Sequence, residues 1–280
     1  VVVVNDGGGS VAVEVEAAGE LGLHVQAIDL TTRQGLAVAR NTGIEHSTGS
    51  FLAFLDDDDV FLPDHLRTAL DVLNSSGADL AYADCLVSPR RVNPSGPVAA
   101  PLAFDFPFDP ELLDVANIIP VHSAVLRSVR DLSARFDPDL PALEDWDLWQ
   151  RLAREHGYRF RHVPRHTVVY HRIPAQASMT GQTTAEAAAL AGFGDLLRRL
   201  WRRWPATTGK TARFRSWVGI MYWHAFAEFA QGRRPDFNYY LRSLHEIADA
   251  WTGRVPEGEL IERLAQVVTE KEENVDVAAA

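Results

Sequence analysis

Four consecutive aspartates, residues 56–59, come directly after an apolar run at residues 51–55. Carboxylates this close together repel one another unless a cation compensates their charge. In a turn at the end of a strand, Asp56 and Asp58 can point the same way and offer oxygen ligands to Mg²⁺ or Mn²⁺. Such an ion would stabilise a departing diphosphate. A solvated turn that caps the next helix is the alternative interpretation, but the buried strand before the acids favours the metal site.

A second acidic cluster begins the amphipathic helix predicted at residues 143–155. Glu144, Asp145 and Asp147 crowd its first turn. A helix N-terminus favours carboxylates, so compensation of the helix dipole is one explanation. Three acids within one turn exceed what capping needs. A carboxylate in this position could instead take the proton from an attacking hydroxyl group.

Basic residues and histidines near these clusters could bind phosphate or a metal. The guanidinium of Arg40 offers bidentate contact to phosphate oxygens, although a helix-surface role is the alternative. His171 and Arg172 follow a predicted strand, and a structural role is the alternative for both. Asp6 follows the first strand and could bond a ribose or a base, or only the backbone of its own turn.

The acidic run belongs to a longer pattern. It comprises ARNTGI at residues 39–44, STGSFLAFLDDDD at residues 47–59 and PDHL at residues 63–66. In order and spacing it resembles the centre of the family 2 glycosyltransferases, and the resemblance covers about residues 1–171. It implies an inverting, metal-dependent enzyme with the GT-A fold. The family's first strand and its base-binding segment have no counterpart, so we expect the first strand and helix to be missing from this sequence.

The resemblance also implies roles for individual residues. The helix at residues 143–155 is similar to the family's "ED-DLW-RLA" motif, in which the Asp is the general base; this implies Asp145 as base and Glu144 as the residue that contacts the acceptor or orients the site. The metal ligands implied are Asp58, Asp56 and His171. The residues implied for binding the nucleotide diphosphate are Asp6, Arg40, Asp56, Asp57 and Arg172. Asn41 and Gly43 are expected to shape helix packing.

Strands and helices alternate through the first ninety residues, which predicts an α/β fold. Combined with the resemblance, the prediction is a GT-A-type, Rossmann-like mixed and mostly parallel sheet flanked by helices. We expect a catalytic domain at residues 1–180 and a helical region at 181–280. The predicted strands are residues 1–4, 24–30, 51–55, 78–87, 122–129, 158–163 and 167–171; the predicted helices are 11–20, 34–46, 63–75 and 143–155, with a long loop at 89–110.

The bulk properties narrow the class further. A net charge of −11 argues against a general nucleic-acid binder, which needs excess cations. The single cysteine, Cys85, cannot form an internal disulfide, so a reducing, cytoplasmic compartment is expected. No apolar run reaches the ~20 residues that span a bilayer. The basic, aromatic segment at residues 195–204 predicts a packed helix, with peripheral contact to the inner membrane face as the alternative.

The function expected from these features is transfer of a sugar from a nucleotide diphosphate sugar, UDP-linked by family habit, to an acceptor hydroxyl. The acceptor would be a carbohydrate, a lipid-linked molecule or a small molecule. Two alternatives stay open. A nucleotidyltransferase acting on a sugar phosphate would need a Gly-rich phosphate loop, and the Glu-Asp helix counts against it. A catalytically inactive nucleotide-sugar-binding subunit is the other, and intact acids at both clusters count against it.

Overall fold

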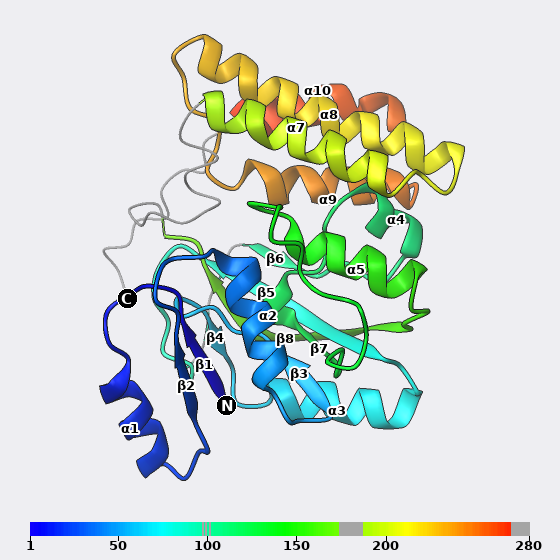
Figure 1. Cartoon of the computed structure of the whole chain (residues 1–280). Coiled ribbons are helices and arrows are strands. Elements are labelled where there is room, and N and C mark those ends of the chain that lie inside the picture. Colours follow the sequence, from blue (N-terminus) through cyan, green and yellow to red (C-terminus); the bar gives the residue numbers. More distant parts are fainter. Residues whose placement is uncertain (97, 99, 101, 174–186, 270–280) are drawn as a thin grey trace.

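The structure is a computed structural model that describes residues 1–96, 98, 100, 102–173 and 187–269. Its first part alternates strands and helices, as predicted (Figure 1). The order is β1 (Val2–Asn5), α1 (Ala12–Glu20), β2 (Gln26–Asp29), α2 (Leu36–His46), β3 (Phe51–Ala53), β4 (Val60–Phe61), α3 (His65–Ser76) and β5 (Leu80–Ser88). Then follow β6 (Leu102–Phe104), α4 (Pro110–Val115), the 3-10 turn η1 (Val121–Ser123), β7 (Ala124–Arg127), α5 (Glu144–Arg154) and β8 (Phe160–His171).

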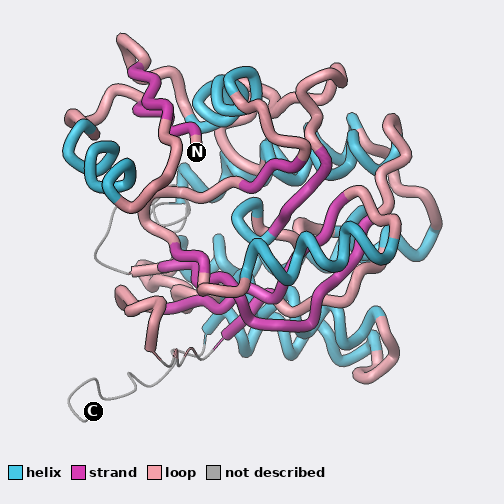
Figure 2. Tube along the Cα trace, turned by 90° about the horizontal axis from the view of Figure 1, so that it is seen from below, coloured by secondary structure: helices cyan, strands magenta, loops and turns pink. Residues whose placement is uncertain are grey.

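The strands form two sheets. β1 and β2 pair in parallel, and a larger sheet has the order β3-β7-β5-β8-β4, with β6 on β5. Figure 2 shows these strands running through the middle of the molecule with helices on both sides. The α/β class and the mixed sheet are therefore confirmed.

Parallel and antiparallel pairing are mixed among the described strands. Only β1–β2 and β5–β8 are parallel pairs, whereas β3–β7, β4–β8, β5–β6 and β5–β7 are antiparallel. Alternating strands and helices give parallel neighbours only when consecutive strands lie side by side. Here β7 enters between β3 and β5 from the opposite direction, and β4 is added at the far edge.

Three other elements differ from the sequence prediction. The two strands expected at residues 158–163 and 167–171 are one continuous strand, β8. The long loop expected at residues 89–110 contains β6, which pairs with β5. Helix α4 was not predicted; it begins at Pro110 and is capped by Asp109, whose carboxylate accepts from two backbone N–H groups.

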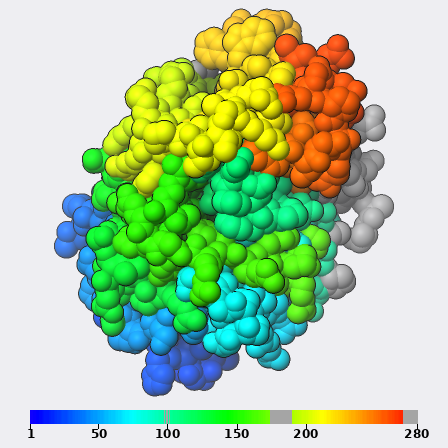
Figure 3. Space-filling view, turned by 90° about the vertical axis from the view of Figure 1, so that its right-hand side faces the viewer, coloured from blue at the N-terminus to red at the C-terminus, as the bar shows by residue number. Residues whose placement is uncertain are grey.

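The C-terminal helices are α7 (Ala187–Arg203), α8 (Gly209–Ala230), α9 (Tyr239–Trp251) and α10 (Leu260–Thr269), with the 3-10 turn η2 (Glu257–Glu259) before α10. They pack over α4 and α5, as Figure 3 shows by their yellow-to-red colours beside the green part of the chain. One hydrophobic core runs through both parts, including Trp149 of α5 and Phe214 of α8. The division at residue 180 lies outside the described residues, so the two expected domains stay a prediction.

Asp147 fastens the helical part to α5. Its side chain is fully buried and accepts hydrogen bonds from Trp204 at 2.7 Å, Arg203 at 3.0 Å and Arg151 at 2.8 Å. Arg203 and Trp204 belong to the segment at residues 195–204, which was expected to form a packed helix or a membrane contact. Because Trp204 is buried and Arg203 pairs with buried Asp147, the structure agrees with the packed helix, and membrane contact stays a prediction. Among the described helices, none is both long and apolar enough to span a bilayer.

Candidate active site

The acidic residues 56–59 form the turn between β3 and β4. Buried Phe54 anchors its start, and the backbone N–H of Asp59 donates to the carbonyl of Asp56 at 3.1 Å. The side chain of Asp56 is 31% exposed and Asp57 is exposed, whereas the side chain of Asp59 is fully buried. In this turn Asp56 therefore faces solvent and Asp59 faces the interior. The nucleotide contact expected of Asp57 stays a prediction.

Arg40 joins this turn to the Glu-Asp helix. From α2, its Nη1 donates to Glu144 Oε1 at 2.5 Å, while its Nη2 donates to both oxygens of Asp56 at 2.8 and 2.9 Å. The residue is 8% exposed. Its guanidinium thus already neutralises two carboxylates in this arrangement, and contact with a diphosphate stays a prediction.

The next residue of the motif also holds the two clusters together. Asn41 exchanges two hydrogen bonds with the backbone of Phe136, at 2.8 and 3.0 Å. These bonds tie α2 to the segment that leads into α5. The expected packing role of Asn41 is therefore what the structure shows.

The helix α5 presents Glu144 and Asp145 from its first turn. Leu143, just before it, has a φ of 62°, a left-handed conformation that is unfavourable for a bulky residue. Glu144 is 5% exposed. Burial raises its pKa to about 7, helped by the charge of Asp145 and opposed by Arg40.

Asp145 is held by two neutral donors. Asn117 Nδ2 donates to Oδ2 at 3.0 Å, and the N–H of Trp146 donates to Oδ1 at 2.8 Å. Burial raises the pKa of Asp145, while Arg40 and the bond from Asn117 lower it. A carboxylate with a raised pKa is a suitable proton acceptor. Sequence reasoning missed Asn117, which lies in no motif.

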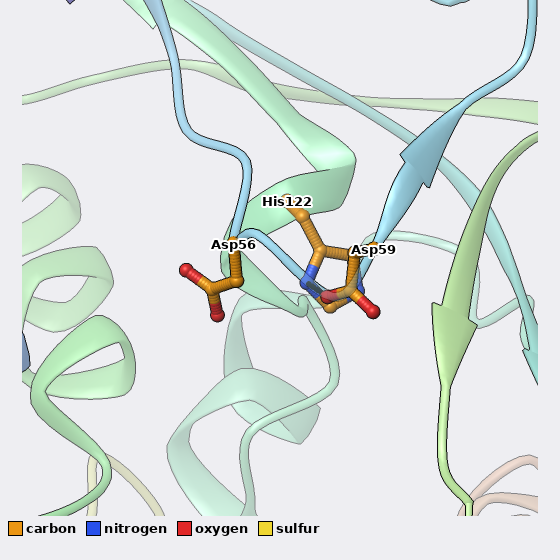
Figure 4. Close-up of side chains that lie close together, drawn as sticks. All are labelled: Asp56, Asp59 and His122. Carbon is orange, nitrogen blue, oxygen red and sulfur yellow. Dashed lines mark ion pairs between the residues drawn. The ribbon is translucent and has the colours of Figure 1, made fainter. Parts of the chain in front are cut away.

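A cluster of possible metal ligands lies beneath the turn. Asp56, Asp59 and His122 bring their ligand atoms within 4.8 Å of one another (Figure 4). His122 belongs to η1, and its Nδ1 lies 3.1 Å from Asp59 Oδ2. Burial raises the pKa of Asp59 to about 8 and lowers that of His122 to about 4. No sequence motif surrounds His122, so its place beside the acidic turn was not predicted.

The expected set of Asp56, Asp58 and His171 is not among the ligand clusters that the described residues form. His171 Nδ1 lies 2.6 Å from the carbonyl oxygen of Asp58, and Nε2 accepts from the N–H of Val92 at 3.1 Å. The backbone N–H of His171 donates to Asp59 Oδ1 at 2.8 Å. Both ring nitrogens bond to backbone in this structure, so His171 supports the acidic turn, and its role as a metal ligand stays a prediction.

Asp6 bonds to backbone. Its Oδ1 accepts from the N–H of Gln34 at 2.6 Å and its Oδ2 from the N–H of Gly35 at 2.8 Å. The carboxylate therefore fixes the segment before α2, which carries Arg40. A nucleoside contact at Asp6 stays a prediction.

Arg172 packs against the C-terminal helical part. It is 7% exposed, with its guanidinium 4.5 Å from the ring centroid of Phe237 and Nη1 3.5 Å from Asn238 Oδ1. Burial lowers its pKa. The predicted phosphate contact of Arg172 stays a prediction.

Comparison with known proteins agrees with this architecture. Residues 1–131 match the family described as Glycosyl transferase family 2. The uncharacterized glycosyltransferase YwdF of Bacillus subtilis is 30% identical over 172 residues, which cover 61% of this chain and 62% of the relative. An uncharacterized glycosyltransferase of Haemophilus influenzae is 44% identical over 45 residues, 16% of this chain and 15% of the relative. The chain thus spans less than two thirds of the length of either relative.

Among solved structures, S. aureus TarS 1-349 in complex with UDP-GlcNAc is similar, with a TM-score of 0.51 and 14% identity over 95% of this chain and 72% of that one. At this identity the likeness concerns the fold. The mixed sheet, the acidic turn and the flanking helices define a protein of the GT-A fold. The match of residues 1–131 assigns this part of the chain to the family 2 glycosyltransferases.

Proposed function

We propose that this chain is an inverting glycosyltransferase that moves a sugar from a nucleotide diphosphate sugar to an acceptor hydroxyl, with a divalent metal at the acidic turn. The observation that carries the proposal is the bridge made by Arg40. It holds Asp56 of the acidic turn and Glu144 of α5 within one hydrogen-bonded group, although 104 residues separate Arg40 from Glu144. The bridge brings the acidic turn close to the start of α5, which supports a donor-binding role for the turn and a proton-accepting role for the helix.

In this reaction the bond between the acceptor oxygen and C1 forms as the bond between C1 and the diphosphate breaks. Asp145 takes the proton of the acceptor hydroxyl, and Asn117 holds its carboxylate in place. Glu144 and Arg40 orient Asp145 and the turn. A divalent cation at the turn would supply positive charge beside the leaving diphosphate. The donor class to test first is the UDP-sugars, because TarS, which shares the fold, was solved with UDP-GlcNAc.

The test is release of nucleoside diphosphate from a panel of UDP- and GDP-sugars with Mn²⁺. Carbohydrate, lipid-linked and small-molecule hydroxyls would serve as acceptors. Asp145→Asn should lower turnover by ~10²–10⁴-fold, the usual share of a general base, while calorimetry still shows nucleotide binding. Asp139→Asn, an exposed acid on the segment before α5, is the matched control and should keep wild-type turnover.

Three other outcomes would contradict this proposal in different ways. Turnover of Asp145→Asn within tenfold of wild type would refute its role as base. Release of pyrophosphate from a nucleoside triphosphate and a sugar phosphate would indicate a nucleotidyltransferase. Donor binding with no turnover for any acceptor would indicate an inactive binding subunit.

A further inference from the structure

We propose that Tyr240, at the start of α9, forms a wall of the acceptor site and packs its ring against a sugar, so that the acceptor is a carbohydrate. The inference rests on the proposed function, because it takes Asp145 as the base at which the acceptor hydroxyl is bound. It places an acceptor contact in the C-terminal helical part, outside the residues 1–131 that match the family. It also selects carbohydrates among the three acceptor classes of the proposed function.

Among the described C-terminal helices, α9 lies nearest the sheet (Figure 1). His245, in its second turn, has Nε2 2.9 Å from the carbonyl oxygen of Ala103 in β6. The ring of His245 also stacks on that of Phe106, with 4.6 Å between the centroids. These contacts hold α9 against the sheet, so the start of the helix has a fixed place relative to the catalytic residues.

The end of β8 holds the segment just before α9. The guanidinium of Arg172 lies 4.5 Å from the ring centroid of Phe237, and its Nη1 lies 3.5 Å from Asn238 Oδ1. The preceding residue, His171, is joined to the acidic turn by contacts of its backbone N–H and of its Nδ1. The start of α9 is therefore tied to the acidic turn, and Tyr240 follows two residues after Asn238.

The side chain of Tyr240 lies close to Asp145. Burial raises the pKa of Tyr240, and the charge of Asp145 raises it further. Charges shift a pKa in this way mainly at short range, so the phenol ring is a near neighbour of the predicted base. Asn117 holds the Asp145 carboxylate at 3.0 Å. An acceptor hydroxyl bound at Asp145 would bring the adjoining atoms of the acceptor to the ring of Tyr240.

Tyr240 can be reached by a ligand, whereas the tyrosines next to it cannot. Tyr239 and Tyr222 are 2% and 9% exposed, but Tyr240 is only partly buried. The ring centroid of Tyr222 lies 6.4 Å from those of both Tyr239 and Tyr240. The two buried rings therefore support the ring of Tyr240, and part of that ring stays open to a ligand.

The hydroxyl of Tyr240 has no hydrogen-bond partner among the described residues. By contrast, Tyr82 and Tyr158 donate to the backbone carbonyls of Phe106 and Arg127, at 2.9 and 3.2 Å. A buried tyrosine hydroxyl usually finds a partner. A hydroxyl group of a bound ligand can supply that partner for Tyr240.

The side chains around Asp145 suit a sugar. A sugar ring has an apolar face of C–H groups and a rim of hydroxyls. An aromatic ring packs on the apolar face, and carboxylates and amides bond to hydroxyls. Tyr240 supplies the aromatic ring, while Asp145, Glu144 and Asn117 supply the polar groups. An aliphatic alcohol would leave these polar groups unpaired, which is costly.

The experiment is saturation-transfer difference NMR with the full chain, Mn²⁺ and either UDP or GDP. The probes are the methyl glycosides of glucose, galactose, mannose and N-acetylglucosamine. Wild type should transfer saturation to the ring C–H protons of at least one glycoside. Tyr240→Leu keeps an apolar side chain but no aromatic ring, and should weaken binding of that glycoside by ~10-fold. Tyr240→Phe removes only the hydroxyl and should weaken binding by ~3-fold, the loss of one hydrogen bond.

Trp223→Ala is the matched control. It removes an aromatic ring of α8 that is 63% exposed, and it should bind the glycoside as wild type does. No saturation transfer from wild type to any glycoside overturns the inference, and so does wild-type affinity in Tyr240→Leu. If Tyr240→Leu fails to fold, wild-type affinity in Tyr240→Phe overturns it.

Turnover separates this inference from the proposed function. Glycoside binding that depends on Tyr240, without sugar transfer to any acceptor, would refute the proposed function alone. Sugar transfer by wild type, with the same acceptor KM in Tyr240→Leu, would refute the inference alone. The expected result is an acceptor KM raised by ~10-fold in Tyr240→Leu, with the donor KM unchanged.

Discussion

Replacing Arg40 with Met should expose how strongly the buried charge bridge stabilises the fold. The substitution keeps a long side chain but leaves Glu144 and Asp56 without their shared cation. Removing one partner of a buried ion pair costs about 3–5 kcal/mol, because an uncompensated charge stays behind. The Asp56 side chain is 31% exposed and water screens it, whereas that of Glu144 is 6% exposed. We therefore expect a loss of about 3 kcal/mol in the free energy of unfolding, the low end of that range.

The loss should depend on pH in a defined direction. Burial raises the pKa of Glu144 to about 7, and Arg40 opposes that rise. Without Arg40 the folded-state pKa climbs further above the unfolded value. The folded variant then binds this proton more tightly than the unfolded chain. The variant's loss of unfolding free energy relative to wild type is therefore complete above the pKa that Glu144 has in the variant. This loss shrinks as the pH falls toward about 7.

Urea unfolding followed by tryptophan fluorescence, with a chelator present, measures both effects. The deficit of Arg40→Met should shrink by at least about 1 kcal/mol between about pH 8.5 and about pH 5.5, since one unit of pKa corresponds to about 1.4 kcal/mol. Adding Glu144→Gln to this variant removes the stranded charge and should recover about 2 kcal/mol. A deficit below about 1 kcal/mol, or one that is the same at both pH values, would refute this reasoning.

Three further perturbations test other parts of the structure. Asp147→Ala leaves Trp204 and Arg151 without their buried acceptor. Urea denaturation should therefore show a loss of about 3 kcal/mol in the free energy of unfolding. A loss under about 1 kcal/mol would contradict the role of Asp147 in joining α5 to the C-terminal helices. His65 is fully buried beside Thr167, and burial lowers its pKa to about 4. In an NMR titration, the resonances of its ring protons should therefore not shift between about pH 8 and about pH 5. A titration midpoint near the ordinary histidine value of about 6.5 would count against that burial. Gly77 ends α3 at φ 66°, so Gly77→Ala should lower the unfolding free energy by about 1 kcal/mol, and no change would show that the turn relaxes.

The fold followed from the sequence where local pattern decides structure. The apolar run at residues 51–55 and the amphipathic pattern at residues 143–155 are local features, and β3 and α5 lie there. The order of the strands in the sheet could not be predicted from local sequence patterns. Whether β7 enters between β3 and β5 depends on contacts between residues far apart in the chain, as in the pairing of Ala53 with Val125.

The acidic turn and the Glu-Asp helix were set by the sequence itself, because adjacent residues create those clusters whatever the rest of the chain does. The tertiary structure alone decided how they meet. Arg40 joins them although it lies 104 residues from Glu144 in the sequence. His122 contacts the turn from η1, and no sequence motif predicts this contact. It also placed His171 beneath the turn, where its ring nitrogens bond to backbone that only folding brings near. Residue types and their spacing along the chain indicate which groups can do chemistry. Burial and long-range hydrogen bonds decide which atoms of these groups stay available for it.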